Sequence, residues 1–65
     1  MPKFKKGDKV RVRRDCASPY RGRIGVIENE PSKDSNGFWY IVKFEWQGLR
    51  AVDRFVEEDL ETVSG

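Results

Sequence analysis

The chain lacks histidine and has a single cysteine, Cys16, among its 65 residues. Without histidine there is no imidazole to act as a general base, and one cysteine forms neither an intramolecular disulfide nor a zinc cluster. Cys16 lies between Asp15 and Ala17 with no pattern that marks a nucleophile, so we interpret it as an ordinary free thiol. We therefore expect no metal site and no cofactor.

Long apolar runs are also missing. The first ten residues, MPKFKKGDKV, contain no apolar stretch, and nowhere in the sequence do about 18 apolar residues follow one another. We therefore predict no signal peptide, no membrane span and a cytoplasmic location.

The short length leaves little room for an active site. Residues 1–65 suffice for a single domain, whose core has no space for an enclosed substrate chamber. No Ser/His/Asp set and no glycine-rich phosphate loop occurs. The adjacent acids Glu57, Glu58 and Asp59 are expected to diverge on a terminal turn rather than to work as a catalytic pair. The sequence predicts a protein that is not an enzyme and has no small-molecule substrate.

Charge is abundant but unevenly distributed. Residues 1–23 hold nine basic and two acidic residues, a net charge of +7, whereas residues 24–65 hold four basic and nine acidic residues, a net charge of −5. Such asymmetry indicates a bipolar surface, with one pole suited to phosphates or to an acidic protein.

Alternating apolar residues predict short strands. In Lys9 to Arg14, KVRVRR, the two valines alternate with arginines, as in a strand with one buried and one solvent-exposed face. Asp15 to Gly22 reads as a loop. Arg23 to Asn29 is the next predicted strand, where Ile24 and Val26 share one face and Gly25 indicates a bulge or a close backbone approach. Residues 28–37, ENEPSKDSNG, have no apolar residue and are predicted to be an exposed hairpin tip.

The clearest strand is Phe38 to Trp46, FWYIVKFEW. Its alternation places Phe38, Tyr40, Val42, Phe44 and Trp46 on the core face and Trp39 on the opposite face. Gln47-Gly48 then forms a short turn into a fourth strand, residues 49–55. A single helical turn over 57–60 precedes a last strand, 61–63. The sequence predicts an all-β fold, a small five-stranded SH3-like barrel with a 3-10 turn before the last strand.

Two groups of SH3-like barrels resemble this chain. GDKVRV (residues 7–12) followed by YRGRIGVI (residues 20–27) resembles the KOW motif of ribosomal proteins and transcription elongation factors. That resemblance implies contact with RNA or DNA. The overall layout, with YIVKFEW in the middle and FVEEDLETV at the end, is similar to photosystem I subunit IV and to the variable chain of ferredoxin:thioredoxin reductase. This second resemblance implies an accessory subunit that holds partners without performing chemistry.

The candidate binding residues are basic and aromatic. The basic set comprises Lys5, Lys6, Lys9, Arg11, Arg13, Arg14, Arg21 and Arg23, whose guanidinium groups suit phosphate oxygens. The alternative is a solvated face that keeps a chain with 37% charged residues soluble. Tyr20 and Trp39 are expected to offer exposed stacking surfaces, or instead to anchor the first loop and to pack under a folded segment. Phe4, Phe55 and Leu60 are expected to close the barrel ends.

The leading hypothesis is a nucleic-acid-binding module in which Arg11, Arg13, Arg21 and Arg23 contact phosphates, with Arg14 beside them. The alternative is a protein-interaction or accessory module that docks on an acidic protein surface through Trp39 and the first loop.

Overall fold

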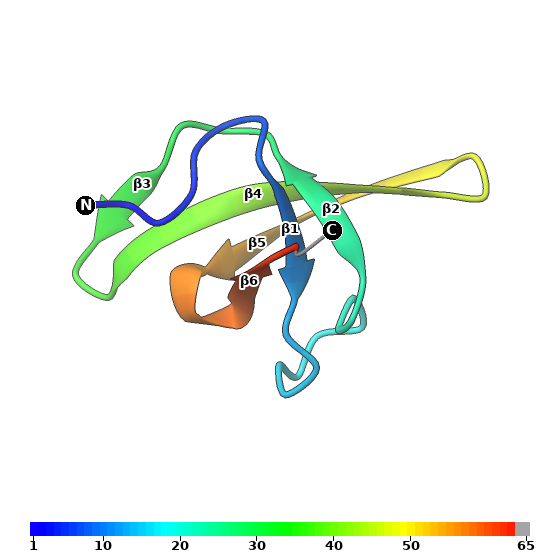
Figure 1. The fold of residues 1–65 in the computed structure, drawn as a ribbon, viewed down its shortest axis with the longest axis horizontal. Helices are drawn as coiled ribbons and strands as arrows, with labels where there is room; N and C mark the ends of the chain where they lie inside the picture. Colours follow the sequence, from blue (N-terminus) through cyan, green and yellow to red (C-terminus); the bar gives the residue numbers. More distant parts are fainter. Residues whose placement is uncertain (64–65) are drawn as a thin grey trace.

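The computed structural model describes residues 1–63 as one curled antiparallel sheet (Figure 1). Its strands are β1 (Lys9–Val12), β2 (Ile24–Ile27), β3 (Ser32–Asp34), β4 (Gly37–Trp46), β5 (Leu49–Val56) and β6 (Leu60–Thr62), and the 3-10 turn η1 (Glu57–Asp59) precedes β6. The strand order is β3-β4-β2-β1-β6, and β5 also pairs with β4. The fold is all-β, as predicted, and its half-barrel shape is compatible with an SH3-like barrel.

The sheet has six strands where the sequence predicted five, and the additional strand is β3. It lies in the segment that was predicted to be a loop. The Asn36 N–H donates to the Asp34 carboxylate at 2.8 Å, and Gly37 adopts a positive φ of 111°. This tight turn brings the polar residues of β3 alongside β4, with Asp34 opposite Gly37. β3 therefore forms through main-chain pairing with β4, which does not require alternating apolar side chains.

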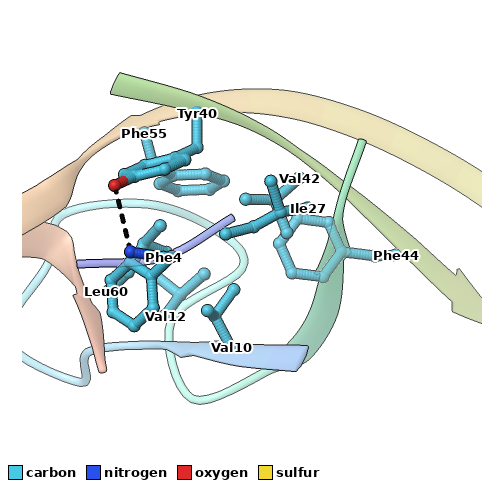
Figure 2. Close-up of a cluster of buried hydrophobic side chains, with 9 residues drawn as sticks. All are labelled: Phe4, Val10, Val12, Ile27, Tyr40, Val42, Phe44, Phe55 and Leu60. Carbon is cyan, nitrogen blue, oxygen red and sulfur yellow. Dashed lines mark hydrogen bonds between the residues drawn. The ribbon is translucent and has the colours of Figure 1, made fainter. Parts of the chain in front are cut away.

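The core fills the concave side of the half-barrel (Figure 2). It consists of Phe4, Val10, Val12, Ile27, Tyr40, Val42, Phe44, Phe55 and Leu60, each at most 6% exposed. The Tyr40 hydroxyl accepts a hydrogen bond from the Phe4 N–H at 3.3 Å and donates one to the Glu57 carboxylate at 2.6 Å. This link ties the N-terminal segment to η1 across the core. Phe4, Phe55 and Leu60, which were expected to close the barrel ends, are all buried in this core.

Gly25 allows β2 to approach β4 closely. A Cβ atom on Gly25 would lie 2.6 Å from the Val42 Cγ1 and 2.7 Å from the Lys43 carbonyl oxygen. The close approach predicted at this glycine is therefore confirmed. Because Gly25 and Ile27 face the core, Ile24 points the other way and is 47% exposed.

The hairpin of β4 and β5 extends beyond the rest of the sheet (Figure 1). Its two turn residues, Gln47 and Gly48, both have positive φ, 53° and 76°, as in the tight turns that suit twisted hairpins. The ladder between β2 and β4 ends at Lys43, so beyond that residue β4 pairs with β5 alone. Trp46 was predicted to face the core, but it is 49% exposed. It lies in the part of the hairpin that extends beyond the core.

Candidate functional site

Three of the predicted arginines line one surface hollow. Arg11 lies on β1, and Arg13 and Arg14 follow the strand directly. Together with Asp15 and Glu61 they enclose about 480 Å³, which we call the arginine hollow. β1 pairs with β6 in a register that places Arg11 opposite Glu61, so the sheet itself sets the position of these groups.

Two of these arginines contact carboxylates. The Arg11 Nη1 lies 3.7 Å from the Glu61 Oε2. Arg13 donates twice to Asp15, from Nε at 3.1 Å and from Nη2 at 3.2 Å. These hydrogen bonds, with the attraction of the two charges, lower the pKa of Asp15 and raise the pKa of Arg13. Arg14 is exposed, and within residues 1–63 no carboxylate pairs with it.

A second, more apolar concavity lies between the first loop and the protruding hairpin. It encloses about 400 Å³, and we call it the hairpin groove. Its apolar wall consists of Tyr20, Ile24, Phe44, Trp46, Leu49 and Ala51. Its charged residues are Arg23, Glu45 and Arg50. Leu49 is 67% exposed, so much of this wall is open to a ligand.

Two stacked pairs organise the groove. The ring of Tyr20 is stacked on that of Phe44, with centroids 4.6 Å apart and planes 3° from parallel. This contact anchors the first loop to β4. The Arg23 guanidinium lies 4.0 Å from the centroid of Trp46, within the range of a cation–π interaction. Tyr20 is half-buried, which agrees with the alternative that it anchors the first loop. Because its ring is stacked on Phe44, less of that ring is left for a ligand to stack on.

Within residues 1–63 the arginine hollow and the hairpin groove share no lining residue, but the pairing of β1 with β2 brings residues of the two side by side. Arg11 in the hollow lies directly opposite Ile24 in the groove across the β1–β2 ladder. The Val12 N–H donates to the carbonyl of Arg23, the residue just before β2, at 2.9 Å, so the pairing of the two chain segments continues beyond the ladder. Arg14 packs beside Gly22, with its Cγ and Nε atoms 3.8 Å from the position a Cβ there would take. A ligand that extends from Arg11 across the ladder to Ile24 on β2 therefore passes from the hollow to the groove.

The other predicted site residues fall in different places. The Arg21 Nη1 donates to the Ser18 carbonyl at 3.4 Å, and Arg21 is exposed between Tyr20 and Gly22. Trp39 lies near the opposite end of β4, outside both concavities. It is half-buried rather than exposed, with the Arg54 guanidinium 4.2 Å from its ring centroid.

The predicted lysines lie outside the arginine hollow. Lys9, on β1, borders a shallow depression that shares Ile24 and Glu45 with the hairpin groove. Lys5 and Lys6 are exposed in the N-terminal segment.

Sequence reasoning missed the residues of the hairpin that line the groove, Trp46, Leu49 and Arg50. The Gln47-Gly48 turn is the signal that could have found them, because a two-residue turn makes Trp46 and Leu49 cross-strand neighbours at a hairpin tip. Their exposure depends on where the ladder between β2 and β4 ends, and the alternation of apolar residues along β4 does not indicate that point.

The remaining groups to place are the Cys16 thiol and the carboxylates. Cys16 is half-buried against the core, and burial raises the pKa of its thiol, the opposite of an activated cysteine. Within the described residues, no three carboxylate or cysteine side chains gather in a way that could hold a metal ion. No helix in this part of the chain has the length and apolar character needed to cross a membrane.

Comparisons with known proteins returned no match: no family model fits the chain, and neither a curated protein nor a solved structure is similar to it. The resemblances to the KOW motif and to the electron-transport subunits therefore rest on the residues that carry them.

Proposed function

We propose that this domain is a non-enzymatic module that binds nucleic acid through its phosphates. The observation that carries the proposal is the arginine hollow, in which Arg11, Arg13 and Arg14 share one concavity. Arg14 packs beside Gly22, which lies in the chain between the two other predicted arginines, Arg21 and Arg23. Guanidinium groups bind phosphate oxygens in pairs of hydrogen bonds, which suits them to a phosphate backbone.

The carboxylates in the hollow do not oppose this role strongly. The Arg13–Asp15 pair is exposed to solvent and the Arg11–Glu61 pair is partly exposed, so solvent screens the attraction within each pair. A phosphate can therefore replace either carboxylate at small cost. The resemblance of residues 7–12 and 20–27 to the KOW motif supports the same proposal, and so does the net charge of +7 over residues 1–23. A cytoplasmic location is part of the proposal.

Phosphate contact has a measurable signature in salt. Each neutralised phosphate releases a counterion, so the affinity should fall linearly with ionic strength on a logarithmic plot. We expect weak sequence preference, because phosphate contacts carry no base information. The experiment measures fluorescence anisotropy of labelled single-stranded and duplex DNA of one sequence over a series of salt concentrations.

Arg14→Ala is the variant to compare. It should weaken binding to all sequences and reduce the salt slope by about 1. Lys33→Ala is the matched control, because Lys33 is exposed on β3, pairs with Phe38 and lies away from the hollow. The control should leave both the affinity and the slope unchanged. Absence of binding to either DNA, or an affinity that does not depend on salt, would contradict the proposal.

The alternative function is a protein-interaction or accessory module. It is favoured by the exposed apolar side chains of the hairpin, Leu49 at 67% and Trp46 at 49%, because desolvated aromatic and aliphatic groups dominate protein interfaces. The layout shared with electron-transport accessory subunits supports it too. Charge reversal at Arg11 and Arg13 separates the two functions: it should abolish nucleic-acid binding, whereas a protein partner should depend on Leu49 at any salt concentration.

A further inference from the structure

We infer that the hairpin groove receives an unpaired nucleobase, so that this domain binds single-stranded nucleic acid more tightly than duplex. The inference rests on the proposed function and deepens it, because it names the class of nucleic acid. It also assigns a binding role to Trp46, Leu49 and Arg50.

The shape and lining of the groove suit a planar aromatic ligand. Its volume of about 400 Å³ lies in the range of roughly 300–1,000 Å³ that small-ligand pockets occupy. Trp46 and Tyr20 supply aromatic surface, and Leu49 and Ala51 supply aliphatic contacts. A base has an apolar face for this wall and a polar edge for the groups at its rim. Stacking tolerates every base, because each has a π-face.

The charges around the groove favour an anionic ligand. The only acid among its lining residues in the described chain is Glu45, and its carboxylate lies 3.5 Å from the ammonium group of Lys43. The two cations of the lining are Arg23 and Arg50, and within residues 1–63 neither pairs with a carboxylate. Phosphates on either side of an inserted base would meet these arginines. This charge complementarity points to a nucleotide rather than to a neutral apolar peptide.

The position of the groove distinguishes single strands from duplexes. The arginine hollow can take phosphates from either form, because a phosphate backbone lies on the outside of both. A base reaches the groove only when it is unpaired and turned out of its stack, and in a duplex this requires breaking a base pair and its stacking. Since Arg11 lies opposite Ile24, a strand bound in the hollow can place its next base in the groove. Trp46 should therefore contribute to single-strand affinity alone.

The test compares binding of fluorescently labelled oligothymidine and of a blunt DNA duplex. Trp46→Ala should weaken oligothymidine binding by about tenfold, which corresponds to the loss of one base stack, and should leave duplex binding within twofold. Trp46 is half exposed at the hairpin tip, so its replacement spares the core. Val52→Ala is the matched control. Val52 is an exposed residue of the same hairpin, is paired with Lys43 and does not line the groove. This control should change neither affinity.

A second measurement does not depend on alanine variants. In a Trp39→Phe protein Trp46 is the one tryptophan, and oligothymidine should quench the tryptophan emission, whereas the duplex should not. In a Trp46→Phe protein the emission of Trp39 should stay unchanged.

The outcomes distinguish a failure of the proposed function from a failure of the inference about the groove. If the unaltered protein binds neither probe, the proposed function fails and this inference fails with it. If both probes bind but Trp46→Ala weakens them equally or not at all, only the inference is overturned, and the groove is left to a protein partner. Quenching of Trp39 in place of Trp46 would overturn it as well.

Discussion

The ring of Tyr20 in the first loop lies flat on the ring of Phe44 in β4, with centroids 4.6 Å apart and planes 3° from parallel. Phe44 is in turn packed edge-on against Phe55, at 5.9 Å and 80°. The first loop is thus fastened to the core at the residue just before Arg21 and Arg23. This contact fixes the position of those arginines relative to the hairpin.

Tyr20→Ala should destabilise the domain by about 2 kcal/mol, because it removes an aromatic pair and leaves part of Phe44 uncovered. Urea unfolding measures the free energy. Tyr20→Phe keeps the stack and should stay within about 0.5 kcal/mol of the unaltered protein. An alanine variant as stable as the unaltered protein would show that the loop is not held by this contact.

Gly25→Ala should cost about 3 kcal/mol, because the added Cβ would lie 2.6 Å from the Val42 Cγ1 and 2.7 Å from the Lys43 carbonyl oxygen and force β2 away from β4. Thermal unfolding followed by circular dichroism measures the change. Gly48→Asn is the control, since Gly48 has a φ of 76° and nothing within 4 Å of an added Cβ, and asparagine tolerates positive φ. Equal effects of the two substitutions would contradict the close approach of β2 to β4.

The Tyr40 hydroxyl should make stability depend on alkaline pH. Burial, together with the hydrogen bond to Glu57, raises the pKa of Tyr40 to about 12, above its ordinary value of about 10. A raised pKa means that the folded protein retains the proton more strongly than the unfolded chain. The stabilisation is therefore complete below about pH 10 and is lost as the pH rises through about 12.

Tyr40→Phe is the variant that isolates this effect. It should be less stable than the unaltered protein by about 1–2 kcal/mol at neutral pH, because the Phe4 N–H and the Glu57 carboxylate lose a partner. The difference should shrink between about pH 10 and pH 12. Urea unfolding of both proteins across this range gives the comparison, and a constant difference would count against a proton held by Tyr40 in the folded state.

Local patterns predicted most of the secondary structure for clear physical reasons. Residues 38–46 alternate strictly, and β4 spans Gly37–Trp46. The Gln47-Gly48 turn and the 3-10 turn lie where they were predicted. β3 was missed because its residues, Ser32–Asp34, are polar and their pairing with β4 depends on the tight turn that precedes Gly37.

The predicted site was a list of residue types whose spatial grouping the sequence could not provide. Arg11, Arg13 and Arg14 do share a hollow, since residues 11–14 form the end of β1 and its direct extension. Trp39 and Trp46, both on β4, lie in different surroundings: Trp39 packs with Arg54 and Trp46 with Arg23. Alternation assigns each side chain to a face of the strand, but it does not say what covers that face.

The sequence by itself determined the all-β class and the basic character of the first 23 residues, because each depends on neighbouring residues or on composition. The tertiary structure decided which side chains remain exposed. The ladder between β2 and β4 ends at Lys43, so the last turn of the hairpin carries Trp46 and Leu49 beyond the core. The groove exists because strands of unequal length are paired, and that pairing is a property of the whole sheet.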